Sequence, residues 1–332
     1  MNLLYSCVAV VALAVAALLA GASEGGRVLV AVVIPYGALL AFLAGVCHRI
    51  ASWARSPVPF RIPTTCGQQQ SLPWIRSASL DNPATGRGAV GRMTLEVLLF
   101  RSLFRNTRAE VHGQRYVFGD SKLLWLVGLA FHWSLLFILL RHLRLLVLPV
   151  PHFVLTLGAI DGFLRLGMPT LYLTNLAVLA ALACLLLRRM RNPLVGYISQ
   201  FSDYFALLLL LGIVVSGMVM RYVTRVDIVA VKQLALGLAT LNPVTPDGLG
   251  SLFLVHLMLV SALAAYFPFS KLMHMGGVFL SPTRNLANNS RMKRHVNPWN
   301  YPVKTHGYGE WQEEFRDKMK MAGIPLDEDP HV

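Results

Sequence analysis

The sequence predicts an all-α integral membrane protein with about six transmembrane helices. Hydrophobic residues make up 55% of the 332 residues, and Asp, Glu, Lys and Arg only 14%, whereas soluble domains carry about 25% charged residues. Six apolar segments match the roughly 20 residues that a helix needs to cross a bilayer core about 30 Å thick. They lie at about residues 3–20, 27–47, 123–147, 169–187, 203–220 and 251–273.

The first apolar run could be mistaken for a signal peptide, because small residues near Ala22 would suit cleavage. Signal peptides begin with a basic region, and this run has none. We therefore expect it to be retained as a spanning helix.

The composition also argues against two kinds of site. The net charge of +14 could suggest a nucleic-acid partner, but the basic residues cluster between the apolar runs, which is typical of membrane orientation. We therefore expect no nucleic-acid partner. The cysteines Cys7, Cys47, Cys66 and Cys184 show no C-x-x-C spacing, so they offer neither a disulfide framework nor an iron–sulfur ligand set. Any iron–sulfur cluster that works with this protein must lie in a partner.

The distribution of Lys and Arg predicts the orientation of the helices. With six spans and an inside N-terminus, the inner segments are 48–122, 188–202 and the tail after 271. With Lys271 counted in the tail, these segments hold 23 of the 30 basic residues. We therefore expect a multi-pass protein of the cell inner (cytoplasmic) membrane, in contact with lipid, with a cytoplasmic C-terminus.

This topology divides the chain into four parts. They are two N-terminal transmembrane helices at 1–47, a cytoplasmic segment at 48–121, a helical core at 122–275 and a cytoplasmic partner-docking tail at 276–332.

The cytoplasmic segment contains an apolar pattern of helical period at residues 94–108. Its apolar side is formed by Leu95, Leu98, Leu99, Leu103 and Phe104. The pattern predicts an amphipathic helix that either lies on the inner leaflet or docks a partner subunit.

The tail contains a second helical pattern at 308–322, which ends at Gly323. Trp311, Phe315 and Met319 follow one side of it. An apolar stripe without a core of its own is typical of a helix that docks on a partner. A role at the membrane surface is the less favoured alternative, because the acidic residues of this helix would be repelled by anionic lipid.

Four of the ten histidines, His132, His142, His256 and His274, lie in or at the edges of the third and sixth apolar runs. An ionisable side chain is costly there, so a function is the default expectation. His132 and His142 are ten residues apart, which is about 15 Å of helical rise and enough for two stacked porphyrins. The alternative is that the four side chains bond backbone carbonyls or line a proton path.

The third and sixth runs cross the membrane in opposite directions, so the histidines form two pairs. His142 approaches the level of His256 on the outer side, and His132 approaches that of His274 on the inner side. Each pair would give one iron two neutral imidazoles and leave no open position, which favours electron transfer. We therefore predict a four-helix dihaem core that binds two haem b. Because His256 and His274 are eighteen residues apart, or about 27 Å of helix, we expect Pro268 to bend or loosen the helix between them.

Basic residues at the helix ends are candidates for binding the haem propionates. They are Arg141, Arg144, Arg221 and Lys271. Ordinary snorkelling toward the membrane interface would explain each of them singly just as well.

The two histidine spacings and the run PFSKLMH, from Pro268 to His274, resemble the gamma subunit of membrane-bound nitrate reductase over about residues 121–285. The axial pairs of that family would again be His132 with His274 and His142 with His256. The extra N-terminal spans, the inner LEVLLFRSLFR and the tail YGEWQEEF are similar to a narrower group. These are the DsrM-type cytochrome b subunits of the DsrMKJOP complexes associated with sulfite reduction, themselves similar to the membrane subunit of heterodisulfide reductase.

The resemblance implies a quinone-coupled electron-transfer subunit in a sulfur-metabolism complex. It would exchange electrons with menaquinone and with a cytoplasmic iron–sulfur subunit resembling the heterodisulfide reductase catalytic subunit. Further membrane, multihaem cytochrome c and iron–sulfur subunits would belong to the same complex. The alternative is the gamma subunit of another quinone-linked reductase, such as nitrate reductase or heterodisulfide reductase.

A quinone headgroup needs hydrogen-bond donors or proton carriers at the edge of an apolar pocket. The outer segment 141–168 supplies Arg144, His152 and Asp161, which predicts quinone chemistry beside the outer histidine pair. Asp161 could carry protons during quinol oxidation. Alternatively, Asp161 caps a short interfacial helix or pairs with Arg165 at i+4.

Overall fold

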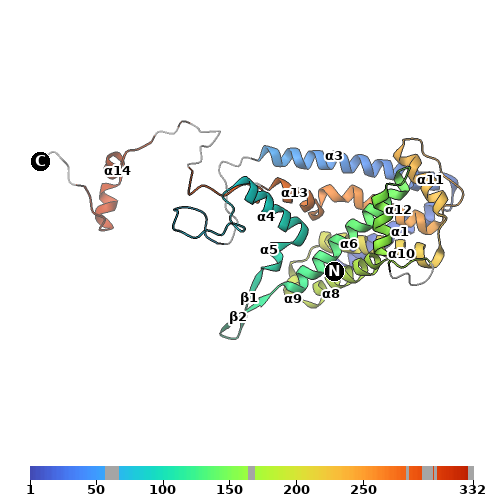
Figure 1. Cartoon of the computed structure of the whole chain (residues 1–332), viewed down its shortest axis with the longest axis horizontal. Coiled ribbons are helices and arrows are strands. Elements are labelled where there is room, and N and C mark those ends of the chain that lie inside the picture. The colour runs from blue at the N-terminus through green and yellow to red at the C-terminus, as the bar shows by residue number, and fades with distance from the viewer. Residues whose placement is uncertain (57–66, 164–168, 282–283, 294–301, 303–304, 328–332) are drawn as a thin grey trace.

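The computed structural model describes residues 1–56, 67–163, 169–281, 284–293, 302 and 305–327, and Figure 1 shows the chain. The helices are α1 (Asn2–Ala20), α2 (Glu24–Val28), α3 (Ile34–Arg55), α4 (Gly86–Leu99), α5 (Arg101–Phe104), α6 (Lys122–Leu146), α7 (His152–Asp161), α8 (Leu173–Arg191), α9 (Pro193–Ile198), α10 (Phe201–Val219), α11 (Ile228–Ala239), α12 (Ser251–Tyr266), α13 (His274–Leu280) and α14 (Tyr308–Met321). The strands are β1 (Thr107–His112) and β2 (Arg115–Asp120). There are also π-helical turns at Leu29–Val33 and Met220–Thr224, and 3₁₀ turns at Phe267–Phe269 and Lys271–Met273.

Within the described residues, six helical segments are long and apolar enough to cross a membrane. They are Asn2–Ala20, Glu24–Arg55, Lys122–Leu146, Leu173–Arg191, Phe201–Thr224 and Ser251–Phe269. A helix satisfies its own backbone hydrogen bonds, so it is a stable way for the chain to cross lipid. The predicted all-α integral membrane protein is therefore confirmed, and each span overlaps one of the six apolar runs.

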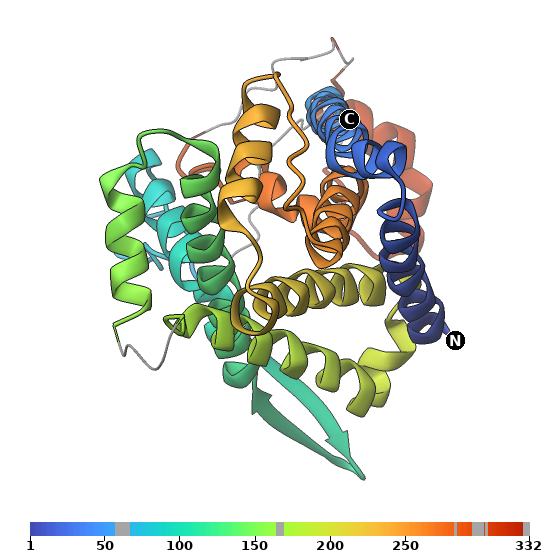
Figure 2. The same ribbon diagram turned by 90° about the vertical axis from the view of Figure 1, so that its right-hand side faces the viewer.

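The bundle is organised around α10, which packs against α1, α8 and α12. The helix α3 packs against α12, and α6 packs against α8. Figure 2 looks along the bundle and shows α6 (green) and α12 (orange) set apart. Among the described residues these two helices make little direct contact with each other. The two spans that carry histidines are therefore held mainly by other helices rather than by each other.

Pro268 interrupts the sixth span, as predicted. The helix α12 ends at Tyr266, and the two 3₁₀ turns follow before α13 begins at His274. Pro268 is buried against Gly45 of α3, where a Cβ atom would lie 2.5 Å from Cγ of the proline. Its carbonyl accepts a hydrogen bond from Nε of Arg49. The glycine thus permits α3 to approach the break closely.

The amphipathic helix predicted at 94–108 is wrong in its bounds. The helix α4 ends at Leu99, Phe100 adopts a left-handed conformation with φ 50° and ψ 47°, and the separate helix α5 follows. The carboxylate of Glu96 accepts hydrogen bonds from the backbone N–H and hydroxyl of Ser102, which caps the start of α5. The helix therefore breaks at Phe100, where Glu96 caps the next helix, although apolar residues continue at helical spacing beyond the break.

The segment before α6 also packs against residues that follow α13. The guanidinium of Arg92 donates to the carbonyl of Arg284, and Nε2 of Gln69 donates to the hydroxyl of Ser290 at 3.1 Å. Parts of the chain about 200 residues apart in sequence thus form one surface unit next to the membrane-spanning helices.

The hairpin β1–β2 departs from the all-helical prediction. Its strands pair antiparallel, from Thr107 opposite Asp120 to His112 opposite Arg115. Gly113 in the turn has a φ of 65°, which glycine adopts readily and which two-residue hairpin turns require. Figure 2 shows the hairpin projecting from the bundle.

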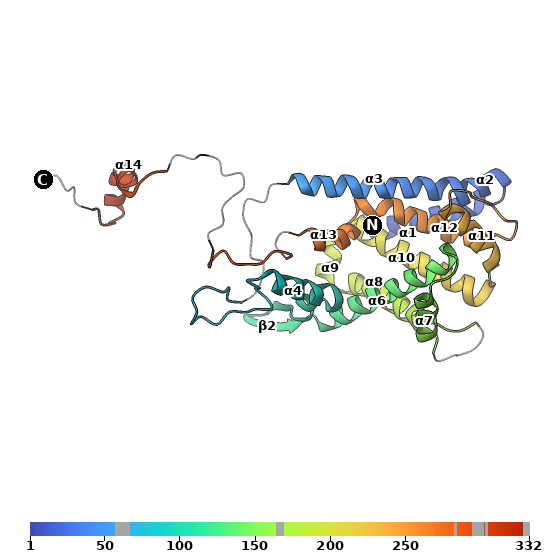
Figure 3. The same cartoon turned by 45° about the horizontal axis from the view of Figure 1, so that its top comes forward.

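The helix α14 confirms the predicted helix in the tail, and Gly323 with a φ of 67° follows its end. The rings of Trp311 and Phe315 lie 5.6 Å apart between centroids, and Trp311 is 41% exposed. Met319, in contrast, is only 3% exposed. The predicted apolar stripe is therefore exposed only in part. Figure 3 shows α14 away from the helical bundle and α11 toward the opposite end of the molecule.

Candidate functional site

The structure brings the four histidines together in the two predicted pairs. The imidazole rings of His132 on α6 and His274 at the start of α13 have centroids 6.0 Å apart and planes at 81°. His142 of α6 and His256 of α12 lie close enough to interact electrostatically. Between His256 and His274, the break at Pro268 replaces the continuation of α12 by two 3₁₀ turns, so His274 does not follow the helical phase of α12.

Each of the four imidazoles is held through Nδ1. The partners are the carbonyl oxygens of Gly128, Ile138 and Lys271 for His132, His142 and His274, at 2.7, 2.7 and 2.8 Å, and Oγ of Ser216 for His256, at 2.9 Å. A carbonyl only accepts, so the neutral ring donates from Nδ1. The hydroxyl of Ser216 donates to the carbonyl of Ile213 at 3.0 Å, so its oxygen also accepts. Among the described residues, this leaves Nε2 of every one of the four rings with a lone pair that no hydrogen bond uses.

Such a set of imidazoles fits a porphyrin-bound iron. Nδ1–H bonds to carbonyls are how metal-binding histidines are usually oriented. The ring centroids of His132 and His274 are 6.0 Å apart, close enough for both imidazoles to hold one iron. Each pair supplies two ligands, the number that a porphyrin iron still requires. The carbonyl-bonding alternative accounts only for Nδ1.

Gly217 lies next to the imidazole ring of His256, where there is no room for a side chain. A Cβ atom on Gly217 would lie 3.3 Å from Cε1 of that histidine. Because real Cβ atoms rarely approach other atoms so closely, any side chain at this position would press on the imidazole.

Three arginines gather around Tyr172 near His142. The guanidinium carbons of Arg141 and Arg221 lie 3.8 and 4.2 Å from the centre of its ring, and Arg144 also interacts with this side chain. Nε of Arg141 and Nε of Arg221 are buried without a hydrogen-bond partner among the described residues. Because an unpaired buried donor is costly, both atoms suit an anionic group such as a haem propionate.

The positive charge of the three arginines affects the pKa of the Tyr172 hydroxyl. Burial raises the pKa of its hydroxyl, but the charges of Arg221, Arg144 and Arg141 lower it, so that the pKa lies below its usual value. The sequence offered no signal for Tyr172 beyond an aromatic residue at the start of an apolar run.

Asp161 is 4% exposed and is anchored on several sides. Its carboxylate lies 3.2 Å from Nη2 of Arg141 and accepts from the backbone N–H and hydroxyl of Thr174 at 2.8 and 2.6 Å. It therefore ties the end of α7 to the first turn of α8, where a negative charge is favourable. The alternative partner Arg165 lies outside the described residues. A role in carrying protons stays a prediction.

His152, the other predicted quinone residue, lies apart from these contacts. It is the exposed first residue of α7, and its Nδ1 lies 3.4 Å from the hydroxyl of Thr156 one turn later. Of the three residues predicted to bind a quinone, Arg144 and Asp161 therefore belong to the arginine cluster, and His152 does not within the described contacts.

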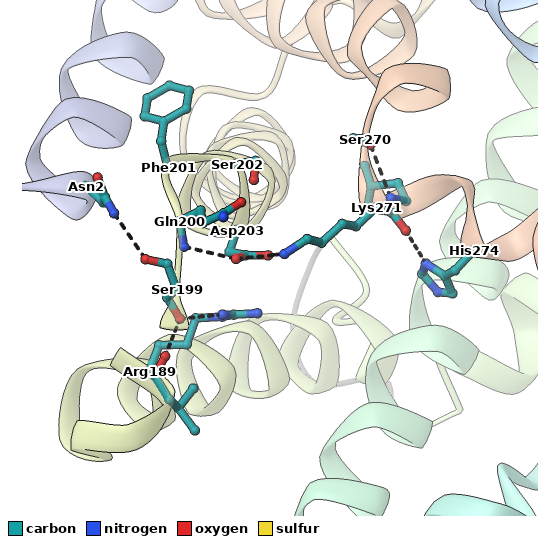
Figure 4. Close-up of polar contacts among 12 residues, drawn as sticks. Asn2, Arg189, Ser199, Gln200, Phe201, Ser202, Asp203, Ser270, Lys271 and His274 are labelled. Carbon is teal, nitrogen blue, oxygen red and sulfur yellow. Dashed lines mark hydrogen bonds and ion pairs between the residues drawn. The ribbon is translucent and has the colours of Figure 1, made fainter. Parts of the chain in front are cut away.

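Lys271 holds the turn that carries His274. Its Nζ lies 2.8 and 3.0 Å from the carboxylate oxygens of Asp203, and its carbonyl accepts from Nδ1 of His274. Figure 4 shows these contacts running from the first turn of α10 to the histidine. Asp203 also forms a capping box with Gln200. The lysine predicted to bind a propionate is thus paired with a carboxylate of the protein, and sequence reasoning missed Asp203.

Comparisons with known proteins match this region. The family model described as nitrate reductase gamma subunit matches residues 93–294, which include all four histidines. An Hdr-like menaquinol oxidoreductase cytochrome b-like subunit from Archaeoglobus fulgidus is 47% identical over 279 residues, or 82% of this chain and 83% of the relative. A protein of the same description from Archaeoglobus profundus is 43% identical over 274 residues, or 80% of this chain and 81% of the relative.

Proposed function

Because the chain belongs to the nitrate reductase gamma subunit family, we propose that it is a membrane cytochrome b subunit with two b-type haems. It transfers electrons between menaquinone or menaquinol and a partner subunit. The observation that carries this proposal is the set of four imidazoles, each bonded through Nδ1 and arranged in two pairs. The inner pair is His132 with His274, and the outer pair is His142 with His256.

Between the imidazoles of each pair, a haem would supply one-electron transfer with no open coordination position. The chain's own groups would orient and neutralise it. The bonds at Nδ1 fix the ring planes of the ligands and increase their basicity. Arg141, Arg144 and Arg221 would bind the propionates of the outer haem, for which the unpaired Nε atoms of Arg141 and Arg221 are suited. Lys271 would act at the inner haem mainly through its bond to His274.

We propose menaquinol as the quinone because both archaeal relatives are subunits of a menaquinol oxidoreductase. We place its headgroup on the outer side, beside the His142–His256 pair. Arg144 is the best-supported residue there, since Asp161 is already bonded to Arg141 and Thr174. The test is haem reduction by a menaquinol analogue in Arg144→Ala and Asp161→Asn proteins. Unaltered rates in both, with intact haem spectra, would remove this site.

We place the protein in the cell inner membrane, with its C-terminus in the cytoplasm. The partner is an iron–sulfur subunit resembling the heterodisulfide reductase catalytic subunit, bound by the tail. The exposed Trp311 and its neighbour Phe315 support docking of a partner on the tail. The relatives are Hdr-like subunits, which supports a partner similar to heterodisulfide reductase. The complex would be of the DsrMKJOP type in sulfur metabolism, with further membrane, multihaem cytochrome c and iron–sulfur subunits.

A second candidate is the gamma subunit of a nitrate reductase, which the matching family model favours. The cytoplasmic subunit that co-purifies separates the two. The experiment is mass spectrometry of the intact purified complex together with its visible spectrum. We expect a b-type spectrum and a heterodisulfide-reductase-like iron–sulfur subunit. A nitrate reductase catalytic subunit would favour the second candidate, and a colourless protein would contradict both.

A further inference from the structure

Phe100 occupies a conformation that a bulky residue rarely adopts. It joins α4 to α5 with φ 50° and ψ 47°, in the left-handed region. Helices often end in this conformation, but glycine is the usual residue there, because a side chain with a Cβ atom is strained. A phenylalanine remains in this region only when its surroundings hold it, and such outliers cluster at functional sites.

Two tryptophans of α6 hold the end of α4. Nε1 of Trp125 donates to the carbonyl of Leu99 at 2.7 Å, and Nε1 of Trp133 donates to that of Leu98 at 3.0 Å. The last carbonyls of a helix have no partner within the helix, so these indoles satisfy groups that would otherwise be unpaired. Trp125 precedes His132 on α6 and Trp133 follows it. Together their bonds hold Phe100 in place relative to α6.

The ring of Phe100 lies against the ligand histidine of the inner pair. The centroids of Phe100 and His132 are 4.9 Å apart, and their planes meet at 89°. Phe131 makes a similar edge contact with the same imidazole at 4.9 Å. His132 is therefore bonded to Gly128, faces His274 and is in edge contact with two aromatic rings, while part of its own surface stays exposed.

The same junction is braced by the chain that follows α13. Glu96, which caps α5 through Ser102, lies 3.7 Å from Nη1 of Arg284. Arg92, one turn earlier on α4, donates to the carbonyl of Arg284. The position of Phe100 therefore depends on contacts with α6 and with the segment after the sixth span.

We propose that Phe100 is a positioning residue for the inner haem. It covers the His132 ligand on the side of α4 and α5, excludes water there, and holds the imidazole plane nearly perpendicular to that of His274. This inference rests on the proposed function, because it requires an iron between these two histidines. An apolar cover disfavours the more highly charged oxidised state and so raises the reduction potential.

The test compares Phe100→Leu and Phe100→Gly with Phe104→Leu in the purified full-length protein. Phe104 lies on α5 and packs on Trp125 at 4.8 Å, but it has no described ring contact with a histidine, so its variant is a matched control. The readouts are a redox titration of both haems and the EPR spectrum of the oxidised protein. The inner haem is identified as the one lost from His132→Ala.

We expect both Phe100 variants to keep two haems, to shift the inner midpoint to lower potential and to change the largest g value of the inner haem. The outer haem and both haems of Phe104→Leu should be unchanged. An unchanged inner midpoint and g value in Phe100→Leu would overturn the inference, as would an equal shift in Phe104→Leu. If the Phe100 variants fail to fold, Trp133→Phe replaces them, since it releases the carbonyl of Leu98 and should shift the same haem in the same direction. No shift in that variant would also overturn it.

Haem content separates this inference from the proposed function. A parent protein without a bis-histidine haem at His132 and His274 would contradict the proposed function. Normal haem content with unshifted potentials would contradict only the role of Phe100.

Discussion

Removal of the Asp161 carboxylate should destabilise the protein strongly, because it leaves a buried charge without its partner. The side chains of Arg141 and Asp161 are only 8% and 1% exposed. Breaking a buried ion pair by removing one partner costs about 3–5 kcal/mol. Arg141 would keep its hydrogen bonds to Thr174 and Asn175 at 3.1 and 3.0 Å. We therefore expect Asp161→Ala to lower the free energy of unfolding by about 3 kcal/mol, the low end of that range.

The matched control is Asp120→Ala, which breaks an exposed pair. Nζ of Lys122 lies 3.4 Å from Asp120, and the two side chains are 61% and 56% exposed. Exposed pairs contribute about 0–1 kcal/mol. Unfolding of both variants and the parent would be followed by circular dichroism as denaturing detergent is added. If Asp161→Ala and Asp120→Ala unfold alike, the carboxylate of Asp161 does not stabilise the arginine cluster.

Three further predictions follow from other contacts. Deleting residues 300–332 should release the iron–sulfur partner and leave both haems in place, and a truncated protein that keeps its partner at full occupancy would contradict docking by the tail. Gly217→Val should remove only the outer haem from the visible spectrum, because its side chain would press on His256, which a Cβ atom already approaches to 3.3 Å. Hydrogen bonds from Arg101 and Arg105 lower the pKa of Asp81 below 3.8, although burial raises it. The stability that this lowered pKa contributes is therefore present above pH 3.8 and is lost as the pH falls through the lower folded value. Limited proteolysis of the 67–105 segment should show this acid sensitivity in the parent and not in Asp81→Asn.

The spans and the histidine pairs could be predicted because lipid imposes simple rules on the sequence. A crossing helix needs a long apolar run. An ionisable residue within such a run is costly, so it indicates a function. Antiparallel crossing then determines which histidines share a level. Pro268 could be identified as the break because its ring and missing N–H disrupt a helix wherever it occurs.

The remaining features depend on partners far away in the sequence. The indole of Trp133 reaches the carbonyl of Leu98 from 35 residues away, and Asp203 reaches Lys271 from 68 residues away. No local pattern predicts such contacts, so the break at Phe100 and the lysine–carboxylate pair were missed. The hairpin has one local sequence feature, Gly113 between two short segments, and this feature does not show up in a helical period.

The two histidine pairs are tested by the haem stoichiometry of the parent, His132→Ala and His142→Ala proteins, measured by pyridine haemochrome analysis and redox titration. We expect two b-type haems per chain in the parent and one in each variant. The haem that remains in His132→Ala should be the one that is lost in His142→Ala. One haem per chain in the parent, or unchanged haem content in either variant, would contradict the assignment of the two histidine pairs.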